Sequence, residues 1–475
     1  MIWTIYGDGK TLLPGEVVAP NQRLSWPRTA GLGAQHVIAM FGGTFIFPIL
    51  LGLSPQLALM MSGVATIVFL LMVKGHVPSY LGTSAAFIAS VAAIRAQGGN
   101  SASVTGAILG AGAILLLVGV TVHFWGSAWV SALLPPAVTG AVVMLIGFSL
   151  APVAAVTYMQ RDPWVALITM SFVILASVLL PGFLSRIAIF LGLVFGVVLS
   201  WVLDALIGPI TTINSATGAA TSALRLNLEG VASAPWIGLP PASVFSATGA
   251  DISAGWHLPS FNAAFILLVV PAVIALVAEN AGHVVAVGEM TGTDLRPYIG
   301  RGLMGDGLGT VVSAAVGGSP TTTYAENIGV MAATRVYSTA AYVVAAAVAF
   351  SLGLSPKVGA FVSATPGGVL AGITLVLYGS IGLLGAKIWK QHNVDLSSPA
   401  NLAPLGAGLT LGIGGGSLIV SEGFTITGIS LGTLVVIGFY HLLRWVRPDL
   451  RRADEARESA TEGSHSAAGM VIAPE

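Results

Sequence analysis

The chain contains no cysteine among its 475 residues. This absence excludes disulfide bonds, thiolate metal sites and a cysteine nucleophile. Charge is also scarce, because only 8% of the residues are charged and the formal net charge is zero. A soluble domain has about 25% charged residues, and nucleic-acid binding requires a basic surface. We therefore expect neither a soluble protein nor a nucleic-acid partner.

Apolar residues are correspondingly abundant. They make up 55% of the chain, and the mean hydropathy is +0.89. Segments of about 20 apolar residues, the length that spans a bilayer as a helix, recur along the sequence. We predict an all-α membrane protein with 14 transmembrane segments, of which the third, ninth and tenth are short or rich in Gly, Ser, Thr and Pro.

The distribution of basic residues tests this count. If the spans alternate from a cytoplasmic amino terminus, only four of the 19 Lys and Arg residues fall outside: Arg95, Arg161, Arg225 and Lys357. The excess inside agrees with the positive-inside rule, so both termini are predicted to be cytoplasmic. The predicted parts are a cytoplasmic segment without a cleavable signal peptide (1–27), spans 1–7 (28–208), an extracytoplasmic loop (209–259), spans 8–14 (260–446) and a disordered cytoplasmic tail (447–475).

The two sets of spans resemble each other. PPAVTGAVVMLIGFSL (135–150) matches GGVLAGITLVLYGSIG (367–382), and YLGTSAAF (80–87) matches TTTYAEN (321–327). Seven spans is an odd number, so two related halves must be inverted in the membrane. Inverted repeats with interrupted helices are typical of secondary transporters, whose substrate site lies at the breaks. Chance similarity between glycine-rich helices is the alternative.

Glu279 and Glu326 are the two carboxylates that we expect inside spans. A bare charge at mid-membrane costs about 3 kcal/mol or more, unless the group faces a cavity, finds donors or takes a proton. His283 follows Glu279 by four residues and shares its helix face, so the pair could relay a proton. A hydrogen bond that only holds helices together is the alternative for each carboxylate. His36 is the other mid-span histidine, with packing and function equally open, and no metal site is expected.

The interrupted segment 321–327 would free backbone N–H and C=O groups, which are tolerated only beside protein or a cavity. A flat heterocycle with alternating donors and acceptors could pair with such groups and with carboxylates.

At these residues the chain resembles the nucleobase–ascorbate transporter family, also called nucleobase cation symporter-2. The resemblance covers nearly all of residues 24–446, and its stretches are AQHVIAMFGGT (34–44), VPSYLGTSAAF (77–87), VAENAGH (277–283) and GGSPTTTYAENIGVMAATRVYS (317–338). Within the family, bacterial uracil and pyrimidine permeases are the most similar. The resemblance implies two inverted seven-helix repeats, a core domain (spans 1–4 and 8–11), a gate domain (5–7 and 12–14), and short strands in segments 3 and 10 that meet at the site.

The resemblance also implies roles for individual residues. The implied substrate-binding residues are Glu279, Glu326, Ala85, Ala325, Tyr324, Tyr378 and Gly43, and the implied proton-coupling residues are Glu279, His283 and His36. Ala85 and Ala325 would offer backbone groups, and Tyr378 would close the site from the gate. No cofactor is implied beyond protons as the coupling ion. The implied partners are a nucleobase, protons, the lipid bilayer and a second copy in a homodimer, in a bacterial plasma membrane.

Two departures from the uracil permeases bear on substrate size. Those permeases have Phe at the position of Ala85 and Gly at that of Ala325. Loss of the aromatic ring opens space, so thymine could fit. Glu326 favours uracil-like bases, because members that carry xanthine or urate usually have glutamine there. We predict a proton-coupled uracil importer that works by alternating access; a purine, xanthine or urate permease and an anion transporter of related architecture are the alternatives. No enzyme motif is evident.

Overall fold

The computed structural model describes residues 3–10, 12, 16–213, 220–246, 248–421 and 424–450. The chain divides into two compact units, residues 1–127 with 151–377, and residues 128–150 with 378–475. Most of the predicted tail, residues 451–475, lies outside the described residues.

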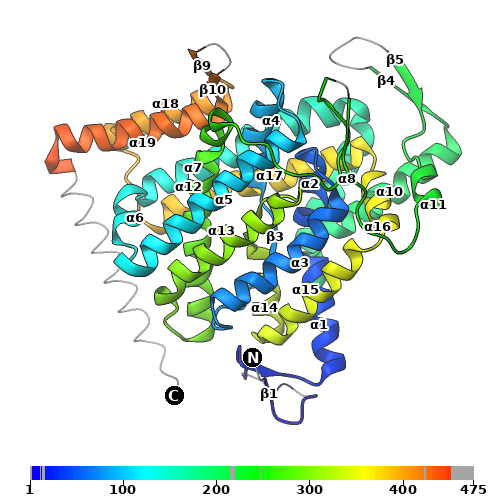
Figure 1. The fold of residues 1–475 in the computed structure, drawn as a ribbon, viewed down its shortest axis with the longest axis horizontal. Helices are drawn as coiled ribbons and strands as arrows, with labels where there is room; N and C mark the ends of the chain where they lie inside the picture. Colours follow the sequence, from blue (N-terminus) through cyan, green and yellow to red (C-terminus); the bar gives the residue numbers. More distant parts are fainter. Residues whose placement is uncertain are drawn as a thin grey trace. The chain divides into compact units, whose positions relative to one another are not determined.

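Five helices of the first unit pack in series. These are α5 (Ser101–Trp125), α13 (Ile299–Ala315), α3 (Pro55–Met72), α15 (Thr339–Gly353) and α1 (Trp26–Ala39). Each contacts the next in this order, and α12 (Ala263–Thr291) contacts both α5 and α13 (Figure 1). The other helices of this unit are η1 (Gly42–Ile46), α2 (Phe47–Leu50), η2 (Ala85–Phe87), α4 (Ile88–Ala96), η3 (Val153–Tyr158), η4 (Met159–Arg161), α8 (Pro163–Leu179), α9 (Phe183–Arg186), α10 (Ala188–Leu206), α11 (Glu229–Ser233), η5 (Arg296–Tyr298), α14 (Ala325–Thr334) and α16 (Pro356–Ser363).

Glycines allow the close packing around α13. A Cβ at Gly307 would lie 2.5 Å from the backbone of Leu116 on α5, and a Cβ at Gly305 would lie 3.1 Å from Phe69 on α3. The stretch GDGLGT (305–310) therefore serves helix packing, and we find no strand before it that a nucleotide-binding loop would need.

Seven helices within the described residues are long and apolar enough to cross a membrane, and two bent pairs would raise that number to nine. One bent pair is α1 with η1 and α2, where the chain turns by 52°. The turn coincides with the π-helical segment Gly42–Ile46, a feature that often marks functional sites. A multi-pass helical membrane protein is thus confirmed, and the count of 14 spans with two inverted repeats stays a prediction.

The two short strands lie where the sequence places them. β3 (Leu81–Thr83) pairs antiparallel with β8 (Thr321–Thr323), in the register Leu81 with Thr323 and Thr83 with Thr321. All six residues are buried, so the pairing satisfies backbone groups that lipid could not. Threonines hold the pair in place: Thr66 bonds the backbone of Leu81, and Thr310 bonds that of Thr321.

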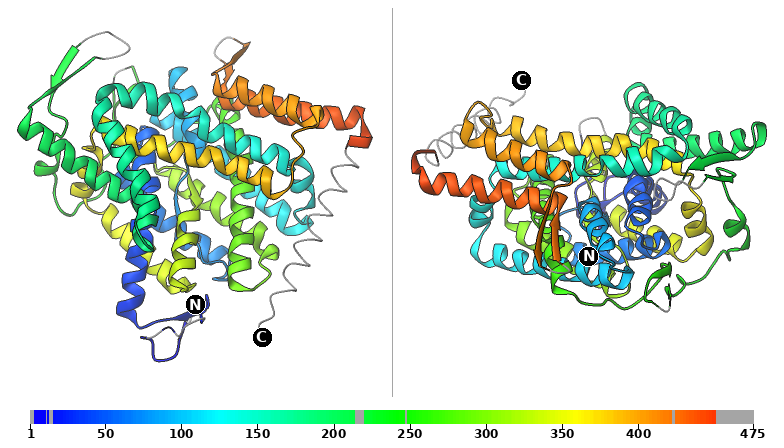
Figure 2. Two further views of the ribbon diagram at one scale, coloured as in Figure 1. Left: turned by 180° about the vertical axis from the view of Figure 1, so that it is seen from behind. Right: turned by 90° about the horizontal axis from the view of Figure 1, so that it is seen from above.

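The predicted loop 209–259 has structure of its own. Its elements are β4 (Ile210–Ile213), β5 (Ala220–Ala223), α11, β6 (Val244–Phe245) and β7 (Asp251–Ser253). The β4–β5 hairpin follows the carboxyl end of α10 (Figure 2). Arg225, two residues after β5, fastens the base of the hairpin. Its guanidinium lies 2.8 Å from Asp162 and 3.1 Å from Asp204, and all three side chains are at most 10% exposed.

A second anchor fastens the loop to α4 and α5. The Asp251 carboxylate pairs with Arg95 and accepts hydrogen bonds from the backbone and hydroxyl groups of Ser101, the first residue of α5. Burial raises the pKa of Asp251, but the bonds from Ser101 and Arg95 outweigh burial and hold that pKa below its ordinary value. A carboxylate at a helix amino terminus is also favoured by the helix dipole.

The amino-terminal segment folds against the first unit. β1 (Thr4–Ile5) and β2 (Gln22–Arg23) pair in parallel. Val18 exchanges backbone hydrogen bonds with Arg335 and Tyr337 in the turn between α14 and α15, and it packs with Leu24 and Val336. The segment therefore covers the turn that follows α14.

The second unit is built from α6 (Ala128–Leu133), α7 (Pro136–Ser149), α18 (Pro399–Ile413), the hairpin of β9 (Ser417–Ser421) and β10 (Phe424–Thr427), and α19 (Gly428–Val446). Helices α7, α18 and α19 contact one another. α17 (Gly367–Gln391) runs through the boundary between the units, which falls between Leu377 and Tyr378.

Candidate functional site

Two strand-to-helix breaks build the frame of the site. β3 is followed by η2, which begins at Ala85, and β8 is followed by α14, which begins at Ala325. The first N–H groups of a helix have no acceptor within that helix, so each alanine places backbone donors at the break. Ser84 accepts a bond from Ala86. Ala85 is half-buried and Ala325 is exposed, so neither side chain is packed in the core.

Glu279 and Glu326 lie beside these breaks. Glu279 is on α12, which contacts η2, β8 and α14, and Glu326 is in the first turn of α14. Both side chains are partly buried, and the two carboxyl groups are close enough to interact electrostatically. The structure thus brings Glu279 and Glu326 together. Their carboxyl oxygens are acceptors next to the backbone N–H donors at the start of η2 and of α14.

Tyr324 is packed between the two breaks. Its hydroxyl donates to the carbonyl of Thr83 at the end of β3, and its ring lies against Gly43 and Gly82. A Cβ at Gly43 would overlap the tyrosine hydroxyl, which explains a glycine in the π-helical turn of the first span. In the structure Gly43 therefore contributes by making room for Tyr324.

His36 connects the first span to the half-helix that carries Glu326. Its Nδ1 lies 3.0 Å from the amide Nδ2 of Asn327, which also donates to the His36 carbonyl at 3.1 Å. The ring of Tyr342 on α15 packs on the imidazole with centroids 4.3 Å apart. Both His36 and Asn327 are at most 1% exposed, so the contact joins the first span to α14 in the core. The expected part of His36 in proton coupling stays a prediction.

His283 makes its hydrogen bond to the strand. Its Nδ1 lies 2.8 Å from the hydroxyl of Thr323 on β8. Among the described residues no hydrogen bond joins His283 to Glu279, although the two share a helix face as the i, i+4 spacing predicts. The expected role of this pair in proton coupling stays a prediction.

The sequence reasoning missed a further carboxyl group near Glu279, that of Asp306. α13 begins at Ile299 and places Asp306 in the interior of that helix, 0% exposed. Asp306 accepts a hydrogen bond from Asn280 on α12 and interacts electrostatically with Glu279.

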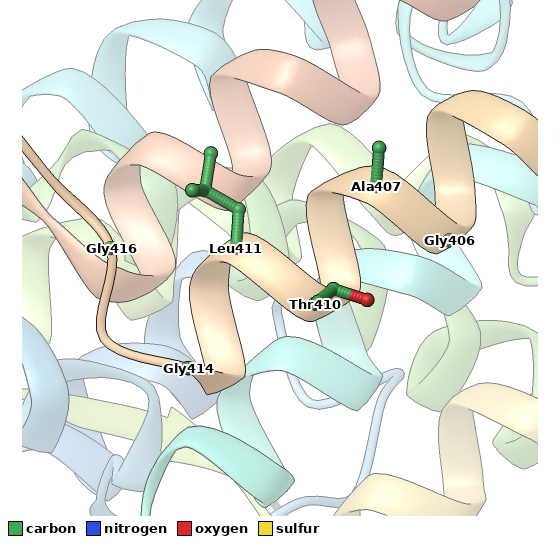
Figure 3. Close-up of a pocket in the computed structure, with 6 residues that line it drawn as sticks. All are labelled: Gly406, Ala407, Thr410, Leu411, Gly414 and Gly416. Atoms are coloured by element: carbon green, nitrogen blue, oxygen red, sulfur yellow. The ribbon is translucent and has the colours of Figure 1, made fainter.

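Two further features lie in the second unit. Tyr378 is its first residue on α17 and is 2% exposed; its predicted position as the gate side of the site stays a prediction. A groove of about 460 Å³ runs along α18 and the turn after it (Figure 3). Its lining has no titratable side chain and consists of Gly406, Ala407, Thr410, Leu411, Gly414 and Gly416. This groove lacks the donors and acceptors of the break region.

Comparison with known proteins places this geometry in a family. A family model described as "Permease family" matches residues 28–420. The chain is 41% identical to "Putative pyrimidine permease RutG" of Escherichia coli strain K12, over 89% of this chain and 90% of that protein. It is 34% identical to "Uracil permease" of Bacillus caldolyticus, over 92% of this chain and 96% of that protein.

Solved structures show a similar fold. The murine Slc26a9 anion transporter in its inward-facing state matches with a TM-score of 0.61 at 11% sequence identity, covering 92% of this chain and 70% of that one. At that identity the likeness concerns the fold alone.

Proposed function

Because the chain belongs to the nucleobase–ascorbate transporter family of permeases, and is therefore a multi-pass membrane transporter and not an enzyme, we propose that it imports uracil and related pyrimidines together with protons. The proposed location is a bacterial plasma membrane with both termini in the cytoplasm, and the proposed assembly is a homodimer.

One observation supports the pyrimidine most strongly: Glu279 and Glu326 lie close enough to interact electrostatically, beside the amino termini that begin at Ala85 and Ala325. The ring N–H groups of uracil are donors, which a carboxylate accepts. Its ring carbonyls are acceptors, which backbone N–H groups at a helix amino terminus satisfy. The site thus offers the complement of a flat ring with alternating donors and acceptors.

The small side chains at the breaks define the proposed size of the ligand. Ala85 and Ala325 leave open the volume that a larger side chain would fill. A pyrimidine with a methyl group at C5, such as thymine, can then bind in the same orientation as uracil. Xanthine or urate is the second candidate, and it is less well matched by a carboxylate at position 326.

Proton coupling would use the buried carboxyl groups. In this proposal Glu279 carries a proton when the site opens to the outside, and substrate and proton leave together when it opens to the cytoplasm. Uracil is neutral near pH 7, so each cycle would carry positive charge inward. The two helix breaks stay fixed around the ligand while the gate moves, as in other transporters with paired broken helices.

Thermal stabilisation tests the substrate. The purified protein is heated with uracil, thymine, xanthine, urate or adenine, because a ligand that binds the folded state raises the midpoint by mass action. We expect shifts with uracil and thymine. A shift with xanthine or urate alone would overturn the pyrimidine assignment and leave the fold unaffected.

Transport in proteoliposomes tests the coupling. Uracil uptake should follow an imposed pH gradient and collapse with a protonophore, and uptake that ignores both would exclude symport. Glu279→Ala should abolish transport and Glu326→Gln should lower uracil affinity. Glu289→Gln is the matched control, because Glu289 is an exposed carboxylate near the end of the same helix as Glu279. Near-normal binding in both site variants would contradict the site.

A further inference from the structure

Four polar side chains form a hydrogen-bonded chain behind the site. His283 Nδ1 lies 2.8 Å from Thr323 Oγ1, and Thr323 Oγ1 lies 3.4 Å from Asn280 Oδ1. Asn280 Nδ2 in turn donates to Asp306 Oδ2. The chain joins α12, β8 and α13, and its three inner members, Thr323, Asn280 and Asp306, are at most 1% exposed.

The carboxyl group of Asp306 sets the direction of the first bond. Oδ2 accepts a hydrogen bond when the group is ionised, and it also accepts when the proton is on the other oxygen. Asn280 therefore turns its NH₂ group toward Asp306. The reverse orientation would place the amide oxygen of Asn280 against Oδ2 and would require the proton of Asp306 to lie on Oδ2. In the structure the amide nitrogen lies on Oδ2, so Oδ2 is the acceptor.

The orientation of Asn280 then fixes the donor and the acceptor in the next two hydrogen bonds. Because the NH₂ of Asn280 faces Asp306, its oxygen faces Thr323 and must accept. The threonine hydroxyl has one hydrogen, and this bond uses it. The same hydroxyl can only accept from His283, so Nδ1 of His283 has to carry a hydrogen.

A neutral imidazole carries one hydrogen, on one of its two nitrogens. We propose that Asn280 and Thr323 are positioning residues that hold His283 in the Nδ1–H tautomer, so that Nε2 keeps its lone pair as the acceptor of a proton or a substrate N–H. The part concerning substrate rests on the proposed pyrimidine transport. The part concerning the tautomer does not, because it follows from the four side chains alone.

The tautomer has a direct spectroscopic signature. In the ¹⁵N spectrum of histidine-labelled protein in lipid, a protonated ring nitrogen and one with a lone pair resonate far apart. His283→Gln assigns the His283 signals among the eight histidines. We expect Nδ1 protonated and Nε2 unprotonated in the wild type, the opposite of the tautomer that free histidine favours. A His283 signal with the hydrogen on Nε2 would overturn the proposal.

Substitution of Thr323 tests the cause. Thr323→Val removes the hydroxyl at nearly constant shape and should return His283 to Nε2–H, whereas Thr323→Ser keeps the hydroxyl and should keep Nδ1–H. Thr374→Val is the matched control, since Thr374 is also fully buried but bonds only carbonyls of its own helix. An unchanged tautomer in Thr323→Val would refute the role of the chain.

Transport separates this inference from the proposed function. A wrong tautomer lowers turnover by large factors where histidine handles protons, so Thr323→Val should lower maximal uracil uptake about tenfold or more, and Thr323→Ser should restore it. Loss of the tautomer without any effect on uptake would retain the structural part and contradict the link to transport. If uracil proves not to be the substrate, the tautomer result is unaffected.

Discussion

Replacing Gly43 by alanine tests whether the π-helical turn exists to receive Tyr324. The added Cβ would overlap the hydroxyl and ring of Tyr324, which Gly82 confines from the side of β3. Either the ring moves or the first span shifts. Overpacking by one methyl group costs about 1–3 kcal/mol, and loss of the bond from Tyr324 to the Thr83 carbonyl costs about 1 kcal/mol. We expect the free energy of unfolding to fall by about 2–4 kcal/mol.

The assay is thermal unfolding in detergent with uracil titration by calorimetry. Gly43→Ala should unfold at a lower temperature and bind uracil more weakly, because Tyr324 directly precedes the half-helix that carries Glu326. Gly438→Ala is the control, since a Cβ at Gly438 on α19 meets nothing within 4 Å and alanine favours a helix by up to about 1 kcal/mol.

A double-mutant cycle isolates the contact. In a Tyr324→Ala background the clash has no partner, so Gly43→Ala should cost little there, and the coupling should approach the full cost of the single substitution. A Gly43→Ala protein as stable as the wild type, with unchanged uracil affinity, would refute this account of the turn.

Three further predictions concern the loop and the ligand. Arg225→Met should lower the free energy of unfolding by about 3 kcal/mol, because it leaves Asp162 and Asp204 buried without their cation; thermal unfolding that matches the wild type would contradict this. The pKa of Asp251 is lowered from 3.8 on folding, so its stabilisation is present above that pH and lost as the pH falls through the lower, folded pKa; Asp251→Asn should flatten the acid limb of stability, and an unchanged limb would argue against the anchor. Ala85→Phe should weaken thymine binding more than uracil binding, and equal losses in a titration would show that position 85 does not limit ligand size.

Composition was sufficient to predict the class of protein, and local breaks were sufficient to place the strands. Few charges and long apolar runs require a membrane solvent, and TTTYAEN in an apolar setting indicated non-helical backbone at 321–327. The antiparallel partner at Leu81–Thr83 came from the resemblance, because a pairing between residues some 240 positions apart leaves no periodic signal in one sequence.

The first span shows where helix prediction fails. The sequence was read as one helix, and the structure bends by 52° at Gly42–Ile46. The pair Gly42–Gly43 and the nearby Pro48 are a local signal for such a bend. Gly43 in this bend makes room for the ring of Tyr324, which comes from the other half of the chain.

The presence or absence of a cationic partner separates the carboxyl groups that stabilise the fold from those proposed to act in transport. Asp162 and Asp204 form buried ion pairs with Arg225, and the partly exposed Asp251 pairs with Arg95, so these carboxylates hold the loop in place. Within the part of the chain that the structure describes, no Lys or Arg forms an ion pair with Glu279, Glu326 or Asp306.

Glu279 instead lies close enough to both Glu326 and Asp306 to interact with them electrostatically. A cluster of like charges in a membrane would be unstable if its only role were to join helices. Asp306 accepts a hydrogen bond from Asn280, and the remaining charge of the three groups would be neutralised by protons or by donors on a ligand. The proposed proton-coupled carrier of a donor-rich heterocycle supplies both. In a chain with few charged residues, the carboxyl groups without a cationic partner are therefore the ones near the broken helices, where the substrate site is proposed.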